Sequence, residues 1–402
     1  MKDSVITAGV ASAALVAALS LAAPVRAEGV ELTFGLGIRA QTESNPAFDG
    51  SGRVSKAGLD LSFGLTSETA LSKLTFGATG MILSANGPGN PKSGLTSPSV
   101  TLNYTRATAG AELTVDASAT DTDLASNSDV TNFTTGRGTQ RNSELTLGLN
   151  WGKIAPLGFG LTAGVTVLSY PVNPDGLASN RTTSLGATTR ADLSPVLHLN
   201  LGVTDTRFTQ AGAARDTLGL LAGLTIDRKN GTLSATLTND HTPEGDRTGL
   251  SFGHEMTLPS GTLSYAVGAT HSAQGKTYAT GSFNYAQELT GGDLTIGLDR
   301  AVTANADTNL ETVQSSASLA YRHAVTQTGS LAVSLNWAEQ RNTGPAPATA
   351  ANTSLSATWI QDLTPDWALD LGYTHRLRDQ ASVTANSDAI FFELRREFTL
   401  RP

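Results

Sequence analysis

The sequence contains no cysteine, and only 15% of its 402 residues are charged, against roughly 25% in an ordinary soluble domain. The lack of cysteine excludes a disulfide scaffold. Beyond the N-terminus, no stretch approaches the roughly 20 apolar residues of a transmembrane helix. There is also no basic excess, since the net charge is −8, and this disfavours a nucleic-acid partner. Thr, Ser, Gly, Asn and Ala replace the missing charges, while the 39% hydrophobic content argues against disorder.

The first 27 residues have the features of an export signal. Lys2 provides a basic start, an apolar stretch follows over residues 5–23, and Val25 and Ala27 occupy the small-residue positions of a signal-peptidase site. We therefore expect residues 1–27 to be a cleaved signal peptide and residues 28–402 to be the mature chain. Cleavage removes two basic residues and one acidic residue, which changes the net charge from −8 to −9.

Apolar and polar residues alternate with a period of two through most of the mature chain. Clear examples are residues 32–38, 145–151, 331–337 and 367–373. This period indicates β-strands with one apolar and one polar face. The pattern predicts about 20 strands, with 18 as the alternative count. Their expected spans are 31–41, 55–66, 71–83, 98–106, 109–118, 141–152, 157–169, 180–192, 196–208, 214–227, 231–241, 246–258, 261–272, 277–288, 293–302, 311–324, 329–340, 351–362, 366–377 and 387–400.

Short and long connections alternate between these strands. Residues 228–231 and 290–292 contain Asn-Gly and Gly-Gly pairs, which favour tight hairpin turns. The connections between the tight turns are longer and polar, as over residues 41–54 and 116–140. This order predicts a meander of antiparallel hairpins whose two ends differ.

Strand length, face composition and aromatic placement favour a membrane-spanning sheet. The expected strands are longer than the five or six residues common in soluble sheets, and they match a tilted membrane strand of about 9–11 residues. Gly, Ser, Thr and Asn fill the polar face, as in a water-filled lumen. Aromatic residues lie near strand ends on the apolar face, as in the girdles of transmembrane barrels. The residues of this expected girdle are Trp151, Trp359, Trp367, Tyr104, Phe159 and Phe398.

A sheet in hydrocarbon cannot leave its edges unpaired, so the first strand should pair with the last. We therefore predict an all-β fold, a closed antiparallel up-and-down transmembrane β-barrel. An even strand count places both chain ends on the side of the tight turns, which is the periplasmic side in outer-membrane barrels.

The last strand alternates Phe392, Leu394 and Phe398 with Glu393, Arg395 and Glu397. It resembles the terminal signal that the barrel-assembly machinery reads, although four residues follow Phe398 here. Over residues 28–402 the chain resembles the bacterial outer-membrane β-barrels, and among them the β-barrel porins. The resemblance implies a location in the outer membrane of a Gram-negative bacterium, with outer-membrane lipids and the assembly machinery as partners. An assembly of several copies stays open.

A barrel of about 20 strands encloses more space than side chains fill, which favours a channel. In general porins, the third outward loop narrows the lumen. Here that connection is residues 116–140, with three carboxylates that could filter ions by charge. An exposed polar loop is the alternative interpretation, and solvated rim charges are the alternative for the arginines on neighbouring strands. The candidate pore-lining residues are Asp121, Asp123, Asp129, Arg39, Arg376, Arg378 and Arg395.

The sequence shows no active-site motif. Its six histidines are scattered without metal-ligand spacing, and it has neither a nucleophile elbow nor a phosphate-binding loop. His254 and His271 lie near expected strand ends, where an outer-membrane enzyme could use them, but an interfacial role is the plainer interpretation. We expect no enzyme activity and no cofactor or metal. The favoured function is passive diffusion of small hydrophilic solutes. The alternatives are export of a polysaccharide or other polymer, and a non-conducting surface or enzymatic barrel.

Overall fold

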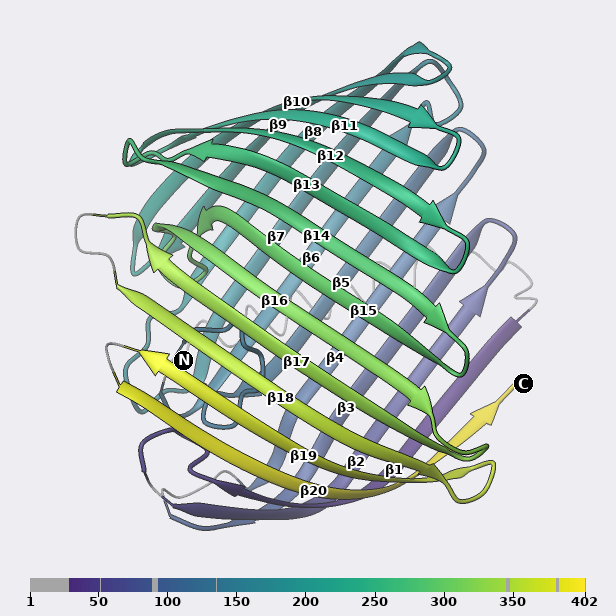
Figure 1. Cartoon of the computed structure of the whole chain (residues 1–402), viewed down its shortest axis with the longest axis vertical. Coiled ribbons are helices and arrows are strands. Elements are labelled where there is room, and N and C mark those ends of the chain that lie inside the picture. Colours follow the sequence, from purple (N-terminus) through teal and green to yellow (C-terminus); the bar gives the residue numbers. More distant parts are fainter. Residues whose placement is uncertain are drawn as a thin grey trace.

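Twenty antiparallel strands form one closed barrel (Figure 1). This confirms the predicted fold class and the predicted count of about 20 strands. The computed structural model describes residues 29–50, 52–88, 93–134, 136–344, 348–380 and 383–401. The expected signal peptide lies outside these residues. None of the described residues forms a helix long and apolar enough to cross a membrane.

The strands follow one another around the barrel in chain order, and each strand from β2 to β19 pairs with its two sequence neighbours. Their bounds are β1 Gly29–Ser44, β2 Arg53–Glu68, β3 Ser72–Asn86, β4 Gly94–Ala107, β5 Ala111–Asp123, β6 Thr139–Trp151, β7 Leu157–Val172, β8 Asn180–Ser194, β9 Leu197–Gln210, β10 Ala213–Arg228, β11 Gly231–Thr242, β12 Gly245–Leu258, β13 Gly261–His271, β14 Thr277–Leu289, β15 Gly292–Ala304, β16 Glu311–Ala324, β17 Gly329–Asn342, β18 Thr349–Asp362, β19 Trp367–Gln380 and β20 Val383–Leu400.

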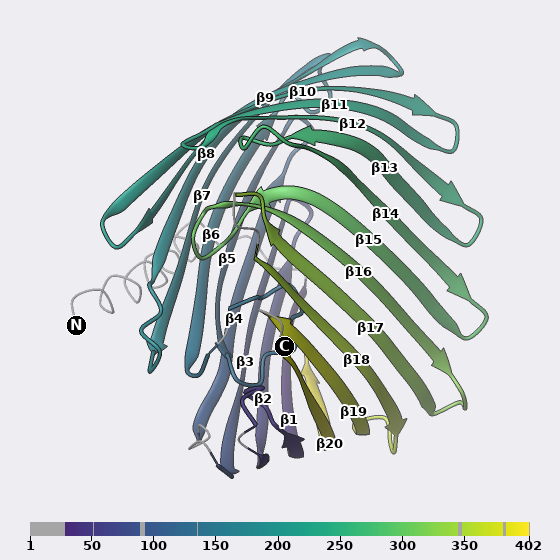
Figure 2. The same ribbon diagram turned by 60° about the vertical axis from the view of Figure 1, so that its left-hand side comes forward.

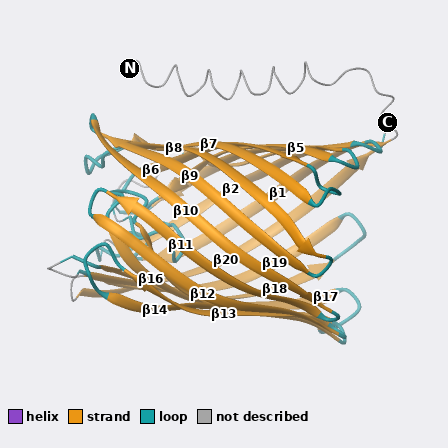
Figure 3. Ribbon diagram, turned by 90° about the horizontal axis from the view of Figure 1, so that it is seen from above, coloured by secondary structure: helices purple, strands orange, loops and turns teal. Residues whose placement is uncertain are grey.

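The barrel closes between its first and last strands. β1 pairs with β20 in antiparallel register from Leu32–Leu400 to Ser44–Asp388, which confirms the predicted closure. The strands are tilted around the barrel (Figure 3), as closure of a sheet requires. The start of β1 and the end of β20 lie at the end of the barrel that carries the short turns, and the longer loops lie at the other end. We call the latter the long-loop end.

The two faces of the wall differ in chemistry, as β10 illustrates. Leu218, Leu220 and Leu224 point outward and are 45%, 50% and 43% exposed. The residues between them, such as Gly219 and Gly223, lie opposite Asp240 and Thr236 of β11 and face the lumen. An apolar outside with a polar inside is the arrangement of a barrel that lipid surrounds.

Aromatic residues gather on the outward face near the short-turn end. Trp151 and Phe159 lie on adjacent strands and stack, with ring centroids 5.5 Å apart. Trp367 lies under the guanidinium of Arg396, which is 5.5 Å from its ring centroid. An arginine on the outward face is tolerated there because it lies at a strand end, where it also reaches Asp366 at 3.5 Å.

Most strands are longer than the alternation predicted. The connection expected over residues 116–140 is only residues 124–138, because β5 continues to Asp123 and β6 begins at Thr139. The sequence reads Ala-Thr-Asp-Thr-Asp over residues 119–123. Both faces of the strand are largely polar there, so this part has no alternation by which it could be recognised. Asp121 and Asp123 are therefore strand residues, not loop residues.

Candidate functional site

The loop between β5 and β6, residues 124–138, is held against the opposite wall of the lumen. The side-chain amide of Asn352 in β18 donates hydrogen bonds to the carbonyl oxygens of Val130 at 2.9 Å and Asn132 at 3.3 Å. Arg376 in β19 donates to the carbonyl oxygen of Asn127 at 2.6 Å. Because these donors lie on the lumen face of strands far around the barrel from β5 and β6, the loop crosses the lumen.

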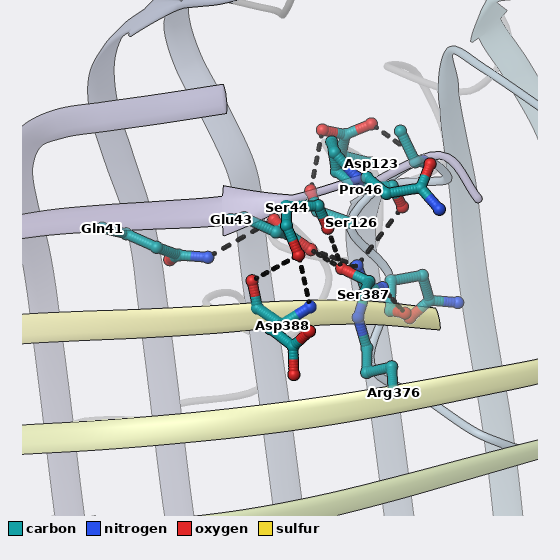
Figure 4. A network of polar contacts seen from close by, with 12 residues as sticks. Gln41, Glu43, Ser44, Pro46, Asp123, Ser126, Arg376, Ser387 and Asp388 are labelled. Carbon is teal, nitrogen blue, oxygen red and sulfur yellow. Dashed lines mark hydrogen bonds and ion pairs between the residues drawn. The ribbon is translucent and has the colours of Figure 1, made fainter. Parts of the chain in front are cut away.

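A buried ion-pair cluster receives this loop (Figure 4). Glu43 of β1 is only 2% exposed, and its carboxylate pairs with Arg376, which is 5% exposed. Lys56 of β2 lies 3.7 Å from Glu43 and donates to the Ser126 hydroxyl of the loop at 3.0 Å. Ser387 of β20 donates to Glu43 at 3.2 Å. Burial makes such a pair stable only while both partners are present, so the cluster fixes the loop to four neighbouring strands, β19, β20, β1 and β2.

The start of the loop is anchored by apolar contacts. Leu124 is 1% exposed and packs with Leu168 and Tyr170 of β7, which are 9% and 8% exposed, and with Leu177. Leu168 and Tyr170 lie on the lumen face, since Leu168 is opposite Asn180 of β8 and Asn142 of β6. Burial of these side chains holds the loop inside the barrel.

A second segment enters the lumen where β14 and β15 part. The two strands pair only from Gly281–Arg300 to Leu289–Gly292. Beyond this point β14 pairs only with β13, whereas the last four residues of β15 pair only with β16. Figure 2 shows the loop between β15 and β16 curving back toward β6 and β7. At the long-loop end, the β15–β16 hairpin therefore turns out of the barrel wall and into the lumen.

At the long-loop end, the β13–β14 hairpin covers the part of the wall from which the β15–β16 hairpin has turned inward. Glu311, 7% exposed, accepts hydrogen bonds from the Ser272 hydroxyl and from the Ala273 N–H at 3.1 Å. The ring of Tyr278, on the lumen face of β14, lies 5.9 Å from the guanidinium of Arg341, on the outward face of β17. Such a contact requires that β14 passes on the outer side of β17. At the long-loop end, β15 and β16 therefore lie on the lumen side of β14.

Asp307 is the meeting point of the two inward segments. It lies in residues 305–310, the turn between β15 and β16. Its carboxylate accepts hydrogen bonds from the Thr134 hydroxyl of the β5–β6 loop at 2.7 Å and from the Tyr170 hydroxyl of β7 at 3.0 Å. Its carbonyl oxygen accepts from Gln210 of β9 at 2.7 Å, and Asn180 of β8 donates to the carbonyl of Ala306 at 3.1 Å. The two segments thus join across the lumen near the long-loop end. We call these contacts the Asp307 junction.

The four candidate arginines lie on the lumen face of β1, β19 and β20. Arg39 is 3.6 Å from Glu393, and Arg395 is 3.0 Å from Asp370. Arg376 and Arg378 lie nearer the long-loop end, where both guanidinium groups approach the ring of Phe48, at 5.0 and 4.6 Å. The structure brings these four residues together on one part of the lumen wall. Of the four, Arg376 alone contacts both the wall and the described residues of the β5–β6 loop.

The three candidate aspartates are in different places. Asp121 lies on the outward face of β5, because Thr120 beside it faces the lumen, and it forms a bidentate pair with Arg141 at 2.6 and 2.8 Å. Asp123 accepts hydrogen bonds from Ala125 N–H at 3.2 Å and the Ser126 hydroxyl at 2.9 Å, within the ion-pair cluster of Figure 4. Asp129 is exposed and bonds to Thr131 at 2.7 Å.

Sequence reasoning did not identify the Asp307 junction or the Glu43 cluster. Asp307 lies in the turn sequence Asn-Ala-Asp-Thr-Asn over residues 305–309, which has the composition of any exposed turn. A signal was available in β7, where Leu168 and Tyr170 are large and partly apolar side chains on the face that otherwise carries Gly and Thr. Such residues on a lumen face indicate that something inside the barrel covers them.

The two histidines near strand ends point outward. His254 lies 3.3 Å from the Tyr265 hydroxyl, and His271 lies 3.1 Å from the Thr277 hydroxyl. Among the described residues, no group of three or more histidine and acidic side chains could hold a metal ion.

No model of a known protein family matches the chain, and no curated protein matches it. Among solved structures, the siderophore receptor PirA from Pseudomonas aeruginosa is 9% identical, with a TM-score of 0.50 over 91% of this chain and 80% of that one. OccK9 from the same organism is 13% identical, with a TM-score of 0.44 over 93% and 99% of the two chains. OccK3 is 11% identical, with a TM-score of 0.41 over 92% and 96%. At these identities the likeness to PirA concerns the barrel fold alone.

Proposed function

From a closed barrel with an apolar outside and a polar lumen, we propose that the chain is an outer-membrane channel through which small hydrophilic solutes diffuse passively. The proposal rests first on size, because a barrel of 20 strands encloses more space than its own side chains fill. It rests second on lining, because glycines and hydroxyl side chains dominate the inward face of most strands.

The observation that carries the proposal is the pair of inward segments that join at Asp307. They cross the lumen near the long-loop end, where Asp307 accepts hydrogen bonds from Thr134 and Tyr170, and in this proposal they narrow the passage there. A lumen that is wide, polar and locally constricted suits a passage that restricts solutes by size and charge.

Within this proposal, Asp123, Asp129, Arg39, Arg378 and Arg395 line the pore together with Asp307, while the buried pair of Glu43 and Arg376 holds the β5–β6 loop at the pore wall. Asp121 is left out because it pairs with Arg141 on the outward face. The remaining carboxylates lie on or beside the β5–β6 loop, opposite the arginines. We expect a weak charge preference rather than strict exclusion, because most of these charges are paired.

The location follows from the same proposal. Residues 1–27 serve as a cleaved signal peptide, the assembly machinery inserts residues 28–402 into the outer membrane, and lipid contacts the apolar strand faces. Copies of the chain associating in the membrane would be compatible with this arrangement. No catalytic residue and no cofactor enters the proposed mechanism.

Conductance of the purified protein in a planar lipid bilayer tests the channel directly. We expect discrete steps, and none from protein that was unfolded by heat before addition. Passage of neutral solutes into proteoliposomes, measured by swelling, gives an independent readout of pore size. A folded barrel that inserts but neither conducts nor admits solutes would overturn the proposal and favour a non-conducting surface or enzymatic barrel.

A further inference from the structure

A cavity of about 230 Å³ lies between the inward β15–β16 hairpin and the wall formed by β9–β12. Thr204, Thr206 and Thr217 line it from the wall, and Thr303 and Asn309 line it from the hairpin. The volume is below the roughly 300–1,000 Å³ of pockets for drug-sized ligands. The inward position of the hairpin creates this cavity, because a hairpin that stayed in the wall would leave only open lumen there.

The cavity presents hydrogen-bonding groups that have no partner in the protein. Among the described residues, none forms a hydrogen bond with the side-chain hydroxyls of Thr204, Thr206, Thr217 and Thr303 or with the side-chain amide of Asn309. Each hydroxyl can both donate and accept. These groups come from two facing elements, so a molecule in the cavity meets them on two sides.

Each charged group at the cavity has partners within the protein. Asp240 accepts two hydrogen bonds from Arg247 through one of its oxygens, at 3.0 and 2.7 Å, and Glu244 pairs with Arg215. The Glu311 carboxylate is occupied by hydroxyl and N–H donors, including Thr343 at 2.9 Å. Because both arginines are paired with a carboxylate, the described residues at the cavity leave no unopposed positive charge to attract an anion.

One acceptor remains directed into the cavity. A Cβ added at Gly219 would lie 2.9 Å from Oδ1 of Asp240, the oxygen that Arg247 does not use. Glycine at this position therefore leaves room for an oxygen that can accept a hydrogen bond from a ligand hydroxyl. Acceptance by a carboxylate is stronger than by a neutral group.

We propose that this cavity binds a small neutral polyhydroxylated solute, such as a sugar or polyol, during its passage through the channel. The proposal rests on the channel function and specifies its substrate class. A ligand of this class offers several hydroxyl groups, which match unpaired hydroxyls on two sides, and carries no charge that the paired ions would oppose. Binding should be weak, because a solute in transit must also leave.

The test uses detergent-solubilised, folded full-length barrel with glucose and sorbitol as probes. Saturation-transfer NMR measures binding without requiring conduction, and block of ionic current by the same sugars measures binding within the channel. We expect saturable binding of glucose and weaker binding of gluconate, its anionic counterpart. Saturable binding to a barrel that does not conduct would overturn the channel function and leave the site intact. Conduction without saturable binding would overturn the site alone.

Two matched double variants locate the binding. Thr206→Val with Thr217→Val keeps side-chain shape and removes two cavity hydroxyls, so we expect about tenfold weaker binding. Thr225→Val with Thr236→Val removes two hydroxyls from the lumen face of β10 and β11 outside the cavity, and should leave binding unchanged. Equal losses in both variants, or tighter binding of gluconate than of glucose, would overturn the assignment.

Discussion

Opposite parts of the lumen wall carry different kinds of polar side chain. The charged wall, on β19, β20, β1 and β2, carries acidic and basic side chains that pair with one another, as Arg395 does with Asp370 and Arg39 with Glu393. The hydroxyl wall, on β8–β12, consists mainly of threonine, serine and glycine.

The difference indicates that the charged side chains in this lumen act mainly by holding other parts of the protein in place. In the charged wall the ion pairs fix side chains to each other and, through Arg376 and Lys56, to the β5–β6 loop. In the hydroxyl wall many side chains have no hydrogen-bond partner among the residues that the structure describes, so they remain available to solutes. The first wall therefore positions the constriction, and the second offers binding groups.

Removal of the buried ion pair in the charged wall should cause the largest loss of stability. Arg376→Ala leaves Glu43 buried without its closest cation, and we expect about 3–5 kcal/mol of lost stability. Denaturant unfolding of the barrel in lipid vesicles, followed by tryptophan fluorescence, measures this loss. The double variant Glu43→Gln with Arg376→Met removes both charges and should lose less. If the double variant is the less stable of the two, the buried pair is not the source of the effect.

The hydroxyl wall should tolerate charge on one face only. Ala222→Arg places a guanidinium on the outward face in the middle of β10, where contact with lipid should cost about 2–4 kcal/mol. Thr225→Arg places the same group in the lumen, where water solvates it, so its effect should be far smaller. Equal destabilisation of the two variants in lipid would contradict the assignment of faces.

The Asp307 junction joins the two inward segments, and Asp307→Ala removes the carboxylate that accepts from Thr134 and Tyr170. Hydrogen bonds to a charged group contribute about 1.5–3 kcal/mol, so the segments should separate more often. We expect larger conductance or more frequent transitions between levels in single-channel recordings. Asp299→Asn, which alters a carboxylate on the lumen face of β15 away from the junction, is the control and should keep the parental record.

The smallest effect that we expect is a change in ion selectivity when carboxylates on or beside the β5–β6 loop are neutralised. We expect the channel to prefer cations weakly at low salt, because carboxylates lie on or beside the β5–β6 loop. Replacing Asp123 and Asp129 together with Asn removes two of these carboxylates and should reduce this preference. The difference should fade as the Debye length shrinks from about 10 Å at 0.1 M salt to 3 Å at 1 M. Reversal potentials under a salt gradient measure it. Asp121→Asn removes an outward carboxylate and should leave the reversal potential unchanged, and a shift equal to that of the double variant would place the filter elsewhere.

The barrel was predictable because lipid imposes a regular pattern on every strand that it touches. Leu218, Leu220 and Leu224 identify β10 without any structural information, and the Asn-Gly pair at residues 230–231 fixes the following turn. Above the membrane that constraint ends. The part of β5 nearest the long-loop end is polar on both faces, so its sequence predicts a loop where the structure has a strand. Asp307 lies in a turn whose sequence contains no sign of its inward path. These features depend on contacts between distant segments, which leave no local pattern.

The place of the charged wall has a consequence for how the molecule is made. Glu43 and Arg376 are 333 positions apart in the chain, and the 13 residue pairs between β1 and β20 join the earliest strand to the latest. None of these contacts can form while the chain is still being delivered to the membrane. Until then β1 presents an unpaired edge, which is a template for pairing with another chain. The ion pairs at this seam therefore require both ends of the chain, and they distinguish a completed barrel from a truncated or unfinished one.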